Sequence, residues 1–418
     1  MTHTAETRRK MLDEFASAII DINVTSRLAN IYIDKIGYEI RDKLFKETKA
    51  FCHTYGTGSL YEGMPLDVCN DEDIMFLRRS FPMVLFQSPD LYDISKSGYL
   101  TASQCLYEPL YLMLQANDNK KGLDDVIIKS LGRSGILMND VLINMCIYKN
   151  IPKTKRRGPS IQYIGTLKKF PGYEGPKSDA LDTILCMRCQ WSPRAREFFT
   201  RPRKNWPSKA LLDKMSKLDC FVVPCGPHET QLPDVEWRLS FSLHEKELLH
   251  EMPESHFKCM YVMKALKNKY VIYDDSAKPT PFCSYFVKTA CLWMCERIPR
   301  TTCNIMELTR ATLNWLIDCY QRRNLPHYFI PEQNLIKHLS TECDDVIARL
   351  TTIRKHLWAM EMSCLDCLYT GSHVFVNKIC DALNIKVIVD KACDWSSLER
   401  VFLNIQISYR KLYLCFLK

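Results

Sequence analysis

The 418-residue sequence contains no apolar run that approaches the length of about 18 residues needed to span a membrane. Its first segment, MTHTAETRRKMLDEF, carries charges where a secretory signal would need an apolar core. There is also no internal repeat and no low-complexity tract, which argues against solenoids and disordered arrays. Because hydrophobic residues make up 46% and charged residues 25%, we expect a globular cytosolic or nuclear protein, with the cytoplasm as the predicted compartment.

The sequence also lacks the cysteine pattern of a disulfide framework or a zinc site. Twenty cysteines are scattered through a long chain instead of framing a small secreted domain. The closest pairs lie in apolar segments without a second matched pair nearby, so we interpret them as buried free thiols. These pairs are Cys186 with Cys189, Cys364 with Cys367, and Cys291 with Cys295.

The positive charge is concentrated in one part of the chain. Between residues 151 and 209 there are 14 Lys or Arg and 4 Asp or Glu, a net charge of +10, whereas the whole chain carries +9. A cluster of this kind is typical of proteins that bind a polyanion, because each neutralised phosphate releases counterions. A solvated basic surface without a partner is the alternative.

The hydrophobic pattern divides the chain into three parts. Residues 5–50 have apolar residues three or four apart and predict one long helix or two. From about 55 to 190, short apolar runs between Gly, Pro, Asn and Asp clusters predict a mixed sheet, with the Pro-, Gly- and Lys-rich segments IPKTKRRGPS and KKFPGYEGPKSD as loops. After the strand-like WRLSFS, helical patterns dominate and predict a helical lobe.

Two acids stand two residues apart in the segment DEDIMF. The apolar residues after Asp73 predict a strand, on which Asp71 and Asp73 share one face. Neighbouring carboxylates repel each other unless a cation lies between them, and hard oxygen ligands suit Mg²⁺ bound together with phosphates. The alternative is that both acids cap turns and face solvent.

Two further elements fit the same chemistry. Gly58 would let backbone amides approach a phosphate, and Ser59 would add a hydroxyl donor, although a Gly-Ser pair alone is a weak signal. Asp182 begins a second apolar run in SDALDTILCMRC. A third acid beside the first two could hold two metal ions that activate an attacking hydroxyl and stabilise the leaving oxygen.

These segments resemble a known family. The blocks GSLYEGM, NDEDIMF, GPKSDALDTILCMRCQWS, EWRLSFSLHEK, YVMKALK, SYFVKTACLW and LPHYFIPEQNL occur in the order seen in cGAS-like receptors, the Mab-domain nucleotidyltransferases related to cyclic GMP-AMP synthase. The resemblance covers residues 50–340. It implies an α+β, bilobed nucleotidyltransferase fold with a spine helix (1–50), a mixed-sheet catalytic core (51–243) and a C-terminal helical lobe (244–418).

The resemblance also implies an activity and roles for individual residues. It implies a nucleotidyltransferase that makes a cyclic dinucleotide from ATP and GTP with Mg²⁺ or Mn²⁺, in innate immune sensing. Asp71 stands where the family often has Glu, and either carboxylate can bind Mg²⁺. Surface charge or core packing is the alternative for the nucleotide-binding residues. The implied catalytic and metal-binding residues are Asp71, Asp73 and Asp182, and the implied nucleotide-binding residues are Gly58, Ser59, Arg238, Lys264, Ser284 and Tyr285.

One departure from the family bears on the activating ligand. The vertebrate DNA-sensing members have a zinc-binding, Cys-rich insertion before the lysine helix, and HEKELLHEMPESHFKCMYVMK has none. The spacing of Cys259 with His244, His250 and His256 does not resemble a zinc cage. We therefore expect double-stranded RNA in preference to DNA, recognised through backbone and shape. The candidate contacts are Lys153, Lys155, Arg156, Arg157, Lys168, Lys169, Arg201, Arg203 and Lys204.

Three points stay open at this stage. A catalytically silent scaffold or developmental interaction protein of the same fold is the main alternative, although all three acids are present. A linear, template-independent RNA polymerase would need the same acids and would differ in its product. Dimerisation on a long ligand is an option that no residue pattern supports.

Overall fold

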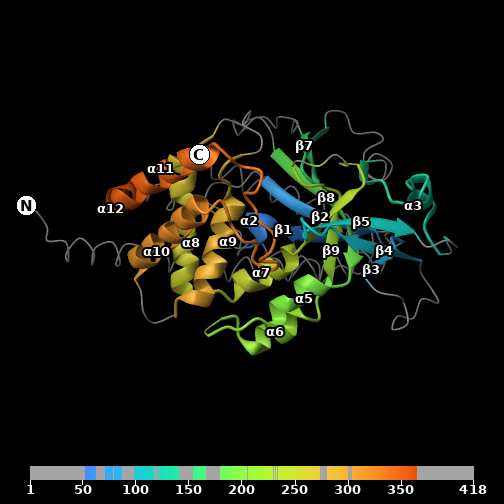
Figure 1. Cartoon of the computed structure of the whole chain (residues 1–418), viewed down its shortest axis with the longest axis horizontal. Coiled ribbons are helices and arrows are strands. Elements are labelled where there is room, and N and C mark those ends of the chain that lie inside the picture. The colour runs from blue at the N-terminus through green and yellow to red at the C-terminus, as the bar shows by residue number, and fades with distance from the viewer. Residues whose placement is uncertain are drawn as a thin grey trace, which may run out of the picture.

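The computed structural model describes most of the chain between residues 52 and 364 (Figure 1). The predicted spine helix within residues 1–50 lies outside the described residues, as does everything after 364. The described ranges are 52–62, 71–78, 80–86, 98–116, 120, 122–140, 154–165, 179–204, 206–228, 230, 232, 234–273, 280–299 and 304–364.

The strands form one mixed sheet. Within the described residues its order is β1-β2-β8-β3-β4-β5-β10-β9, while β7 pairs with β8 and β6 with β7. The pairs β2·β8, β3·β8 and β3·β4 are parallel and the other pairs are antiparallel, which confirms the predicted mixed sheet. The strands are β1 (Cys52–Thr57), β2 (Asp71–Arg78), β3 (Met83–Leu85), β4 (Tyr99–Gln104), β5 (Tyr111–Ala116), β6 (Thr154–Arg157), β7 (Ser160–Gly165), β8 (Asp179–Cys189), β9 (Cys220–Val223) and β10 (Glu236–Ser240).

Strand β8 organises the sheet. It pairs with β2, β3, β7 and β9. It therefore connects β2, which carries Asp71 and Asp73, to the rest of the sheet. Its C-terminal half is mostly apolar, apart from the exposed Arg188, and Cys186 and Met187 are fully buried, as expected for a strand covered on both faces.

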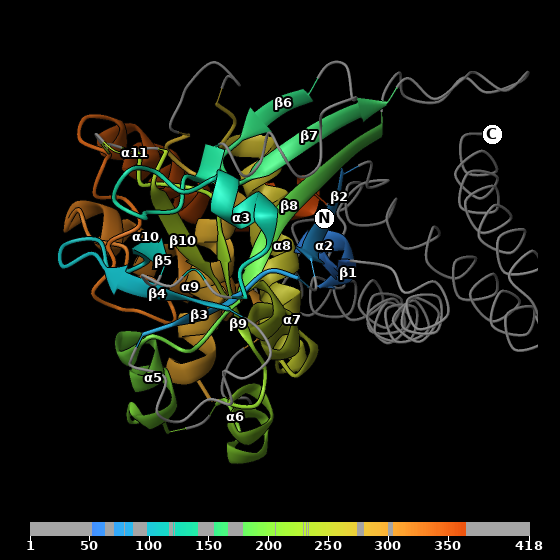
Figure 2. The same cartoon turned by 90° about the vertical axis from the view of Figure 1, so that its right-hand side faces the viewer.

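The loop prediction for IPKTKRRGPS is wrong for its central part. Residues Thr154–Arg157 form β6, which pairs with β7 through the register Arg157↔Ser160. Gly158, with φ 59°, and Pro159 make the two-residue connection, and a glycine tolerates this positive φ without strain. Figure 2 shows the hairpin beside β8 at the upper edge of the sheet.

Helices account for much of the rest of the described chain. Helix α7 begins two residues after β10 ends, so the change from strand to helix occurs within the segment RLSFSL. Helices α8 to α12 gather on the left in Figure 1, and the sheet lies on the right. The helices are α2 (Gly58–Tyr61), α3 (Asp125–Lys129), α5 (Pro193–Thr200), α6 (Lys209–Met215), α7 (Ser242–His250), α8 (Glu254–Tyr270), α9 (Ser284–Arg297), α10 (Ile305–Gln321), α11 (Glu342–Lys355) and α12 (Leu357–Ser363).

Local capping explains where several helices start. Asn304 accepts from the backbone amide of Glu307, and Glu307 accepts from the amide of Asn304, which completes a capping box at α10. Ser192 caps α5 and Ser208 caps α6 through their side-chain oxygens.

The larger of two hydrophobic clusters among the described residues runs from the sheet into the helices. Trp237 of β10 is fully buried and donates from Nε1 to the carbonyl of Leu137 at 3.2 Å. Phe241, at the junction between β10 and α7, stacks on Phe329 of the helical half with ring centroids 4.4 Å apart. The sheet and the helices therefore share a buried boundary. None of the described helices has the length and apolar character needed to span a membrane.

Candidate nucleotide and metal site

Strands β2 and β8 bring the predicted acids together. Their parallel register pairs Asp73 with Asp182 and Asp71 with Ala180. Residues paired across neighbouring strands project to the same face, as do residues two apart on one strand. The backbone therefore assigns Asp71, Asp73 and Asp182 to one face of the sheet. The side chain of Asp71 is outside the described set, and those of Asp73 and Asp182 are partly buried.

The donor set fits a divalent metal ion. Carboxylates on adjacent strands are hard oxygen donors whose mutual repulsion a cation would relieve. The described side chains alone form no group of three or more His, Cys, Asp or Glu around a metal position, and they do not include Asp71. Asp71, Asp73 and Asp182 are thus the residues that would hold Mg²⁺.

The Gly58–Ser59 turn lies directly against these acids. Thr57 pairs with Asp73 at the end of β1, and its hydroxyl donates to the Asp73 carbonyl at 3.4 Å. Gly58 follows with φ 74°, and a Cβ placed on it would come within 1.9 Å of Asp73 Oδ2. Only a glycine allows the backbone to approach the carboxylate this closely. The turn and the acids therefore form one continuous surface.

Lys264 joins this surface from the helical half. It lies on α8, is 7% exposed, and donates from Nζ to Ser59 Oγ at 2.8 Å. Two predicted nucleotide-binding residues from distant parts of the sequence are thus in direct contact. A lysine at this position would add positive charge next to a phosphate bound at the turn.

Arg238 and Tyr285 lie in a second group of polar residues. Arg238, on β10, pairs with Tyr111 of β5, and burial raises the pKa of Tyr111 to about 12 against the opposing effect of Arg238. Tyr285, on α9, donates from its hydroxyl to Glu245 Oε1 at 3.1 Å. Burial and the charge of Glu245 raise the pKa of Tyr285 well above its usual value, so the hydroxyl stays protonated. Ser284 is the first residue of α9.

His327 fixes the other side of the Tyr285 hydroxyl. The amides of Phe329 and Ile330 both donate to His327 Nδ1, at 3.2 Å each, so this nitrogen carries the lone pair. The neutral ring then has its proton on Nε2, which lies 2.9 Å from the Tyr285 oxygen. Burial, with a smaller contribution from Arg238, lowers the pKa of His327 to about 3 and keeps the ring neutral. The donor order is therefore His327 to Tyr285 to Glu245.

Three charged residues that the sequence analysis did not select complete this network. Lys288 of α9 contacts Glu62 Oε1 at 2.5 Å and Glu245 Oε2 at 2.9 Å. All three side chains are at most 15% exposed. Lys288 lies three residues after Tyr285, one helical turn away, and that spacing is the one sequence signal that could have identified it.

The predicted nucleic-acid contacts have different placements. Lys153, Lys168 and Lys169 are outside the described residues, as are the side chains of β6. Those of β6 are Lys155, Arg156 and Arg157. Lys204 is exposed on the loop after α5. Arg201 and Arg203 are different, because both point into the protein.

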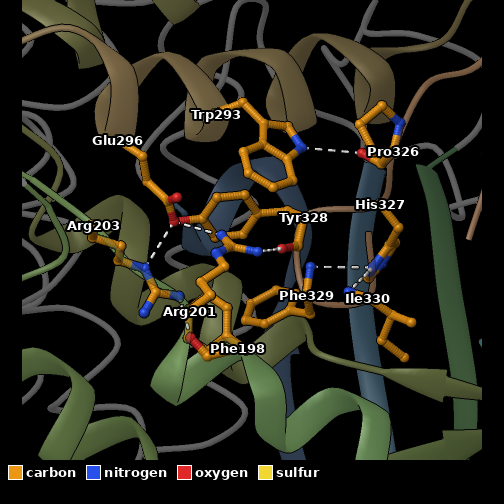
Figure 3. Close-up of polar contacts among 10 residues, drawn as sticks. All are labelled: Phe198, Arg201, Arg203, Trp293, Glu296, Pro326, His327, Tyr328, Phe329 and Ile330. Atoms are coloured by element: carbon orange, nitrogen blue, oxygen red, sulfur yellow. Dashed lines mark hydrogen bonds and ion pairs between the residues drawn. The ribbon is translucent and has the colours of Figure 1, made fainter. Parts of the chain in front are cut away.

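Figure 3 shows how Arg201 and Arg203 converge on Glu296 of α9. The distances to Glu296 Oε1 are 2.5 and 3.0 Å, and the two arginine side chains are 15% and 6% exposed. Tyr328 also donates to this oxygen at 2.7 Å, and the Arg201 guanidinium lies 4.4 Å from the Trp293 ring centroid. We therefore correct the prediction and remove Arg201 and Arg203 from the set of nucleic-acid contacts.

The cysteines and histidines considered for zinc take part in separate buried contacts. Cys186, Cys189, Cys291, Cys295 and Cys364 are buried free thiols, as predicted. The Cys259 thiol lies 3.6 Å from the Thr312 hydroxyl. The His244 ring packs edge-on against Trp191, with centroids 4.5 Å apart. Helices α7 and α8 are joined by residues 251–253 alone.

The fold and the site define a nucleotidyltransferase domain followed by a helical domain. Residues 179–251 match the Mab-21 protein nucleotidyltransferase domain, and residues 255–352 match the Mab-21 protein HhH/H2TH-like domain. Over these residues the chain is similar to Mab-21 proteins, and it is also similar to cyclic GMP-AMP synthase.

Two relatives define the extent of that similarity. Cyclic GMP-AMP synthase of Sus scrofa is 25% identical over 306 residues, which is 67% of this chain and 57% of that protein. Cyclic GMP-AMP synthase of Mus musculus is 23% identical over 354 residues, 78% of this chain and 64% of that protein. The chain thus spans about 57% to 64% of the length of these relatives.

Proposed function

We propose that this protein is a nucleic-acid-activated nucleotidyltransferase that makes a cyclic dinucleotide second messenger from ATP and GTP. The observation that carries the proposal is the contact between two elements: Asp73 pairs with Asp182 across β2 and β8, and Gly58 lies on the Asp73 carboxylate. A phosphate-contacting turn joined to paired acids suits the transfer of nucleotidyl groups. The names of the two curated relatives support the choice of a cyclic product.

The site residues would have two kinds of role, in metal binding and in nucleotide binding. Asp71, Asp73 and Asp182 would hold two Mg²⁺ ions, which would neutralise charge on the triphosphate and on the leaving pyrophosphate. Ser59 and Lys264 would bind the phosphates, and Tyr285 with Arg238 would hold the base. A ribose hydroxyl of one nucleotide attacks the α-phosphorus of the other. The new P–O bond forms as the bond to pyrophosphate breaks, and the hydroxyl proton passes to solvent. A second such step closes the ring.

We further propose that double-stranded RNA activates the protein in the cytoplasm as part of innate immune sensing. Support comes from the basic β6–β7 hairpin and the exposed Lys204, and from the three-residue connection between α7 and α8, where no Cys-rich module is present. These are charges without a base-reading element, so backbone and shape recognition is expected. Dimerisation on a long RNA is a further part of the proposal.

The test is incubation of the purified protein with labelled ATP and GTP and with Mg²⁺ or Mn²⁺. Double-stranded RNA, double-stranded DNA and no ligand form the three arms, with Asp73→Asn as the inactive control. An RNA-dependent, phosphatase-resistant small product that disappears in Asp73→Asn supports the proposal. A linear polymer indicates a template-independent polymerase instead. No product in any arm indicates a catalytically silent scaffold of the same fold.

A further inference from the structure

Two lysines from different helices hold the short helix α2. Lys264 of α8 donates to Ser59 at its first turn, and Lys288 of α9 contacts Glu62, which directly follows the helix. The amide of Glu62 donates to the Gly58 carbonyl at 3.0 Å. Glu62 therefore closes the same turn that places Gly58 on the Asp73 carboxylate. A change in the position of the Glu62 side chain would therefore move that turn.

The second contact of Lys288 leads to the other half of the site. Its Nζ also donates to Glu245 Oε2 at 2.9 Å, while Glu245 Oε1 accepts from Tyr285 at 3.1 Å. Tyr285 is fixed in turn by His327. A continuous series of hydrogen bonds thus runs from the Gly58–Ser59 turn through a single ammonium group to the Tyr285 ring.

Burial makes this series of contacts strong. Glu62 and Glu245 are 3% and 9% exposed and share one cation, so loss of the cation leaves two buried carboxylates facing each other. Burial would lower the pKa of Lys288, but the charges of Glu245 and Glu62 outweigh it and raise the pKa above its usual value. The ammonium group therefore remains charged at any physiological pH.

We propose that Lys288 is a positioning residue, which sets the distance between the phosphate-contacting turn at Gly58–Ser59 and the base platform at Tyr285. This inference rests on the proposed function for its meaning in catalysis, because the turn would hold the triphosphate and Tyr285 the base of the same nucleotide. Lys288 acts through Glu62 and Glu245 and is not a catalytic residue.

Hydrogen exchange tests the coupling without any need for activity. Wild type, Lys288→Met, Lys288→Arg and Lys214→Met are compared by amide exchange of residues 55–62. Lys214 is the matched control, because it forms a surface ion pair with Glu247 on α7 and is 56% exposed. Lys288→Met should raise exchange in this segment about tenfold, and Lys288→Arg should restore most of the protection. Equal exchange in Lys288→Met and Lys214→Met overturns the inference.

A second variant covers the case in which Lys288→Met does not fold. Glu62→Gln keeps the size of the side chain and leaves Lys288 paired with Glu245. It should still increase exchange in residues 55–62, and unchanged protection there overturns the inference. In an active enzyme, Lys288→Met should lower kcat more than it raises KM, and Lys288→Arg should restore most of the kcat. If wild type makes no product in any arm, the proposed function fails, while the exchange result still decides the role of Lys288.

Discussion

Gly58 and Asp73 are in such close contact that the glycine leaves no room for even one additional carbon. A Cβ on Gly58 would lie 1.9 Å from Asp73 Oδ2 and 2.9 Å from its carboxyl carbon. The residue also has φ 74°, a conformation that L side chains rarely adopt. The contact joins the Gly58–Ser59 turn to Asp73, the acid proposed to bind metal, so a change at one must move the other.

We predict that Gly58→Ala lowers product formation by about 100-fold, because the new methyl group displaces the Asp73 carboxylate by roughly an ångström. Gly158→Ala is the control: it has φ 59°, with no heavy atom within 4 Å of the added Cβ. Both variants carry backbone strain, and only one pushes on the acid. Similar activity in the two variants would contradict the assignment of Asp73.

Tyr285→Phe should distinguish the contribution of the Tyr285 hydroxyl from that of its ring. Removing the hydroxyl leaves Glu245 Oε1 and His327 Nε2 without this partner, and the expected loss of stability is about 1 to 3 kcal/mol. The ring for base stacking remains, so KM for nucleotide should change little, whereas Tyr285→Ala should raise it. Denaturant melts and steady-state kinetics check the two effects. A large KM increase in Tyr285→Phe would instead indicate that the hydroxyl contacts the nucleotide.

The stability of the protein should fall at mildly acidic pH. Burial lowers the pKa of His244 to about 4, and burial with Arg238 and Arg201 lowers that of His327 to about 3. Unfolded histidines titrate near pH 6.5. The stabilisation by the neutral rings is therefore complete above about pH 6.5 and is lost as the pH falls toward 4. Each ring should reduce the free energy of unfolding by about 1.4 kcal/mol per pH unit in that window.

Urea midpoints between pH 7.5 and 5 measure this slope. His244→Phe keeps an aromatic ring against Trp191 and should remove roughly half of the pH dependence of stability. A midpoint that stays constant over this range in the wild type would show that the rings titrate normally.

Glu296→Ala should destabilise the fold without a direct effect on chemistry. It leaves the Arg201 and Arg203 guanidinium groups buried without their shared carboxylate, at an expected cost of about 3 to 5 kcal/mol. Asp318→Ala breaks the exposed Arg322 pair on α10 and should cost less than about 1 kcal/mol. Thermal melts compare the two variants. Equal losses would mean that Arg201 and Arg203 are less buried in solution than the structure indicates.

The salt dependence of RNA binding tests the remaining basic surface. Replacing Lys155, Arg156 and Arg157 together by alanine should weaken binding and reduce the log–log salt slope by roughly 2 to 3, because each lost phosphate contact contributes about 0.7 to 0.9. Lys337→Ala, a surface lysine paired with Glu108, is the control. An unchanged slope in the triple variant would remove the β6–β7 hairpin from the interface.

Much of the fold follows from pattern, because the relevant signals are local. DEDIMF lies in β2, LDTILCM in β8 and WRLS in β10, and the helical patterns predicted after WRLSFS correspond to α7 and the helices that follow it. The β6–β7 hairpin was missed because its strand is lysine- and arginine-rich and follows a proline, features that favour loop. Pairing with β7 overrides that local preference.

Apart from the three-residue spacing of Tyr285 and Lys288, no sequence pattern predicts the charged network. Glu245 follows Ser242 by three residues, the spacing of a capping box, yet its carboxylate turns to Lys288 and Tyr285. Arg201 and Arg203 lie in a basic segment, but Glu296, from a different helix, draws them inward. Such partners meet only through tertiary packing, so net charge along the chain cannot distinguish a surface arginine from a buried one.

Because β8 lies in the middle of the sheet, Asp73 and Asp182 can pair only after the chain has folded as far as β8. Asp73 is made early in the chain, but it faces Asp182 only after β8 has been synthesised and inserted between β2 and β3. A nascent or truncated chain that ends before β8 cannot bring Asp182 next to Asp73, whatever its N-terminal strands have formed. Under the proposed function, incomplete copies of the protein would therefore make no second messenger.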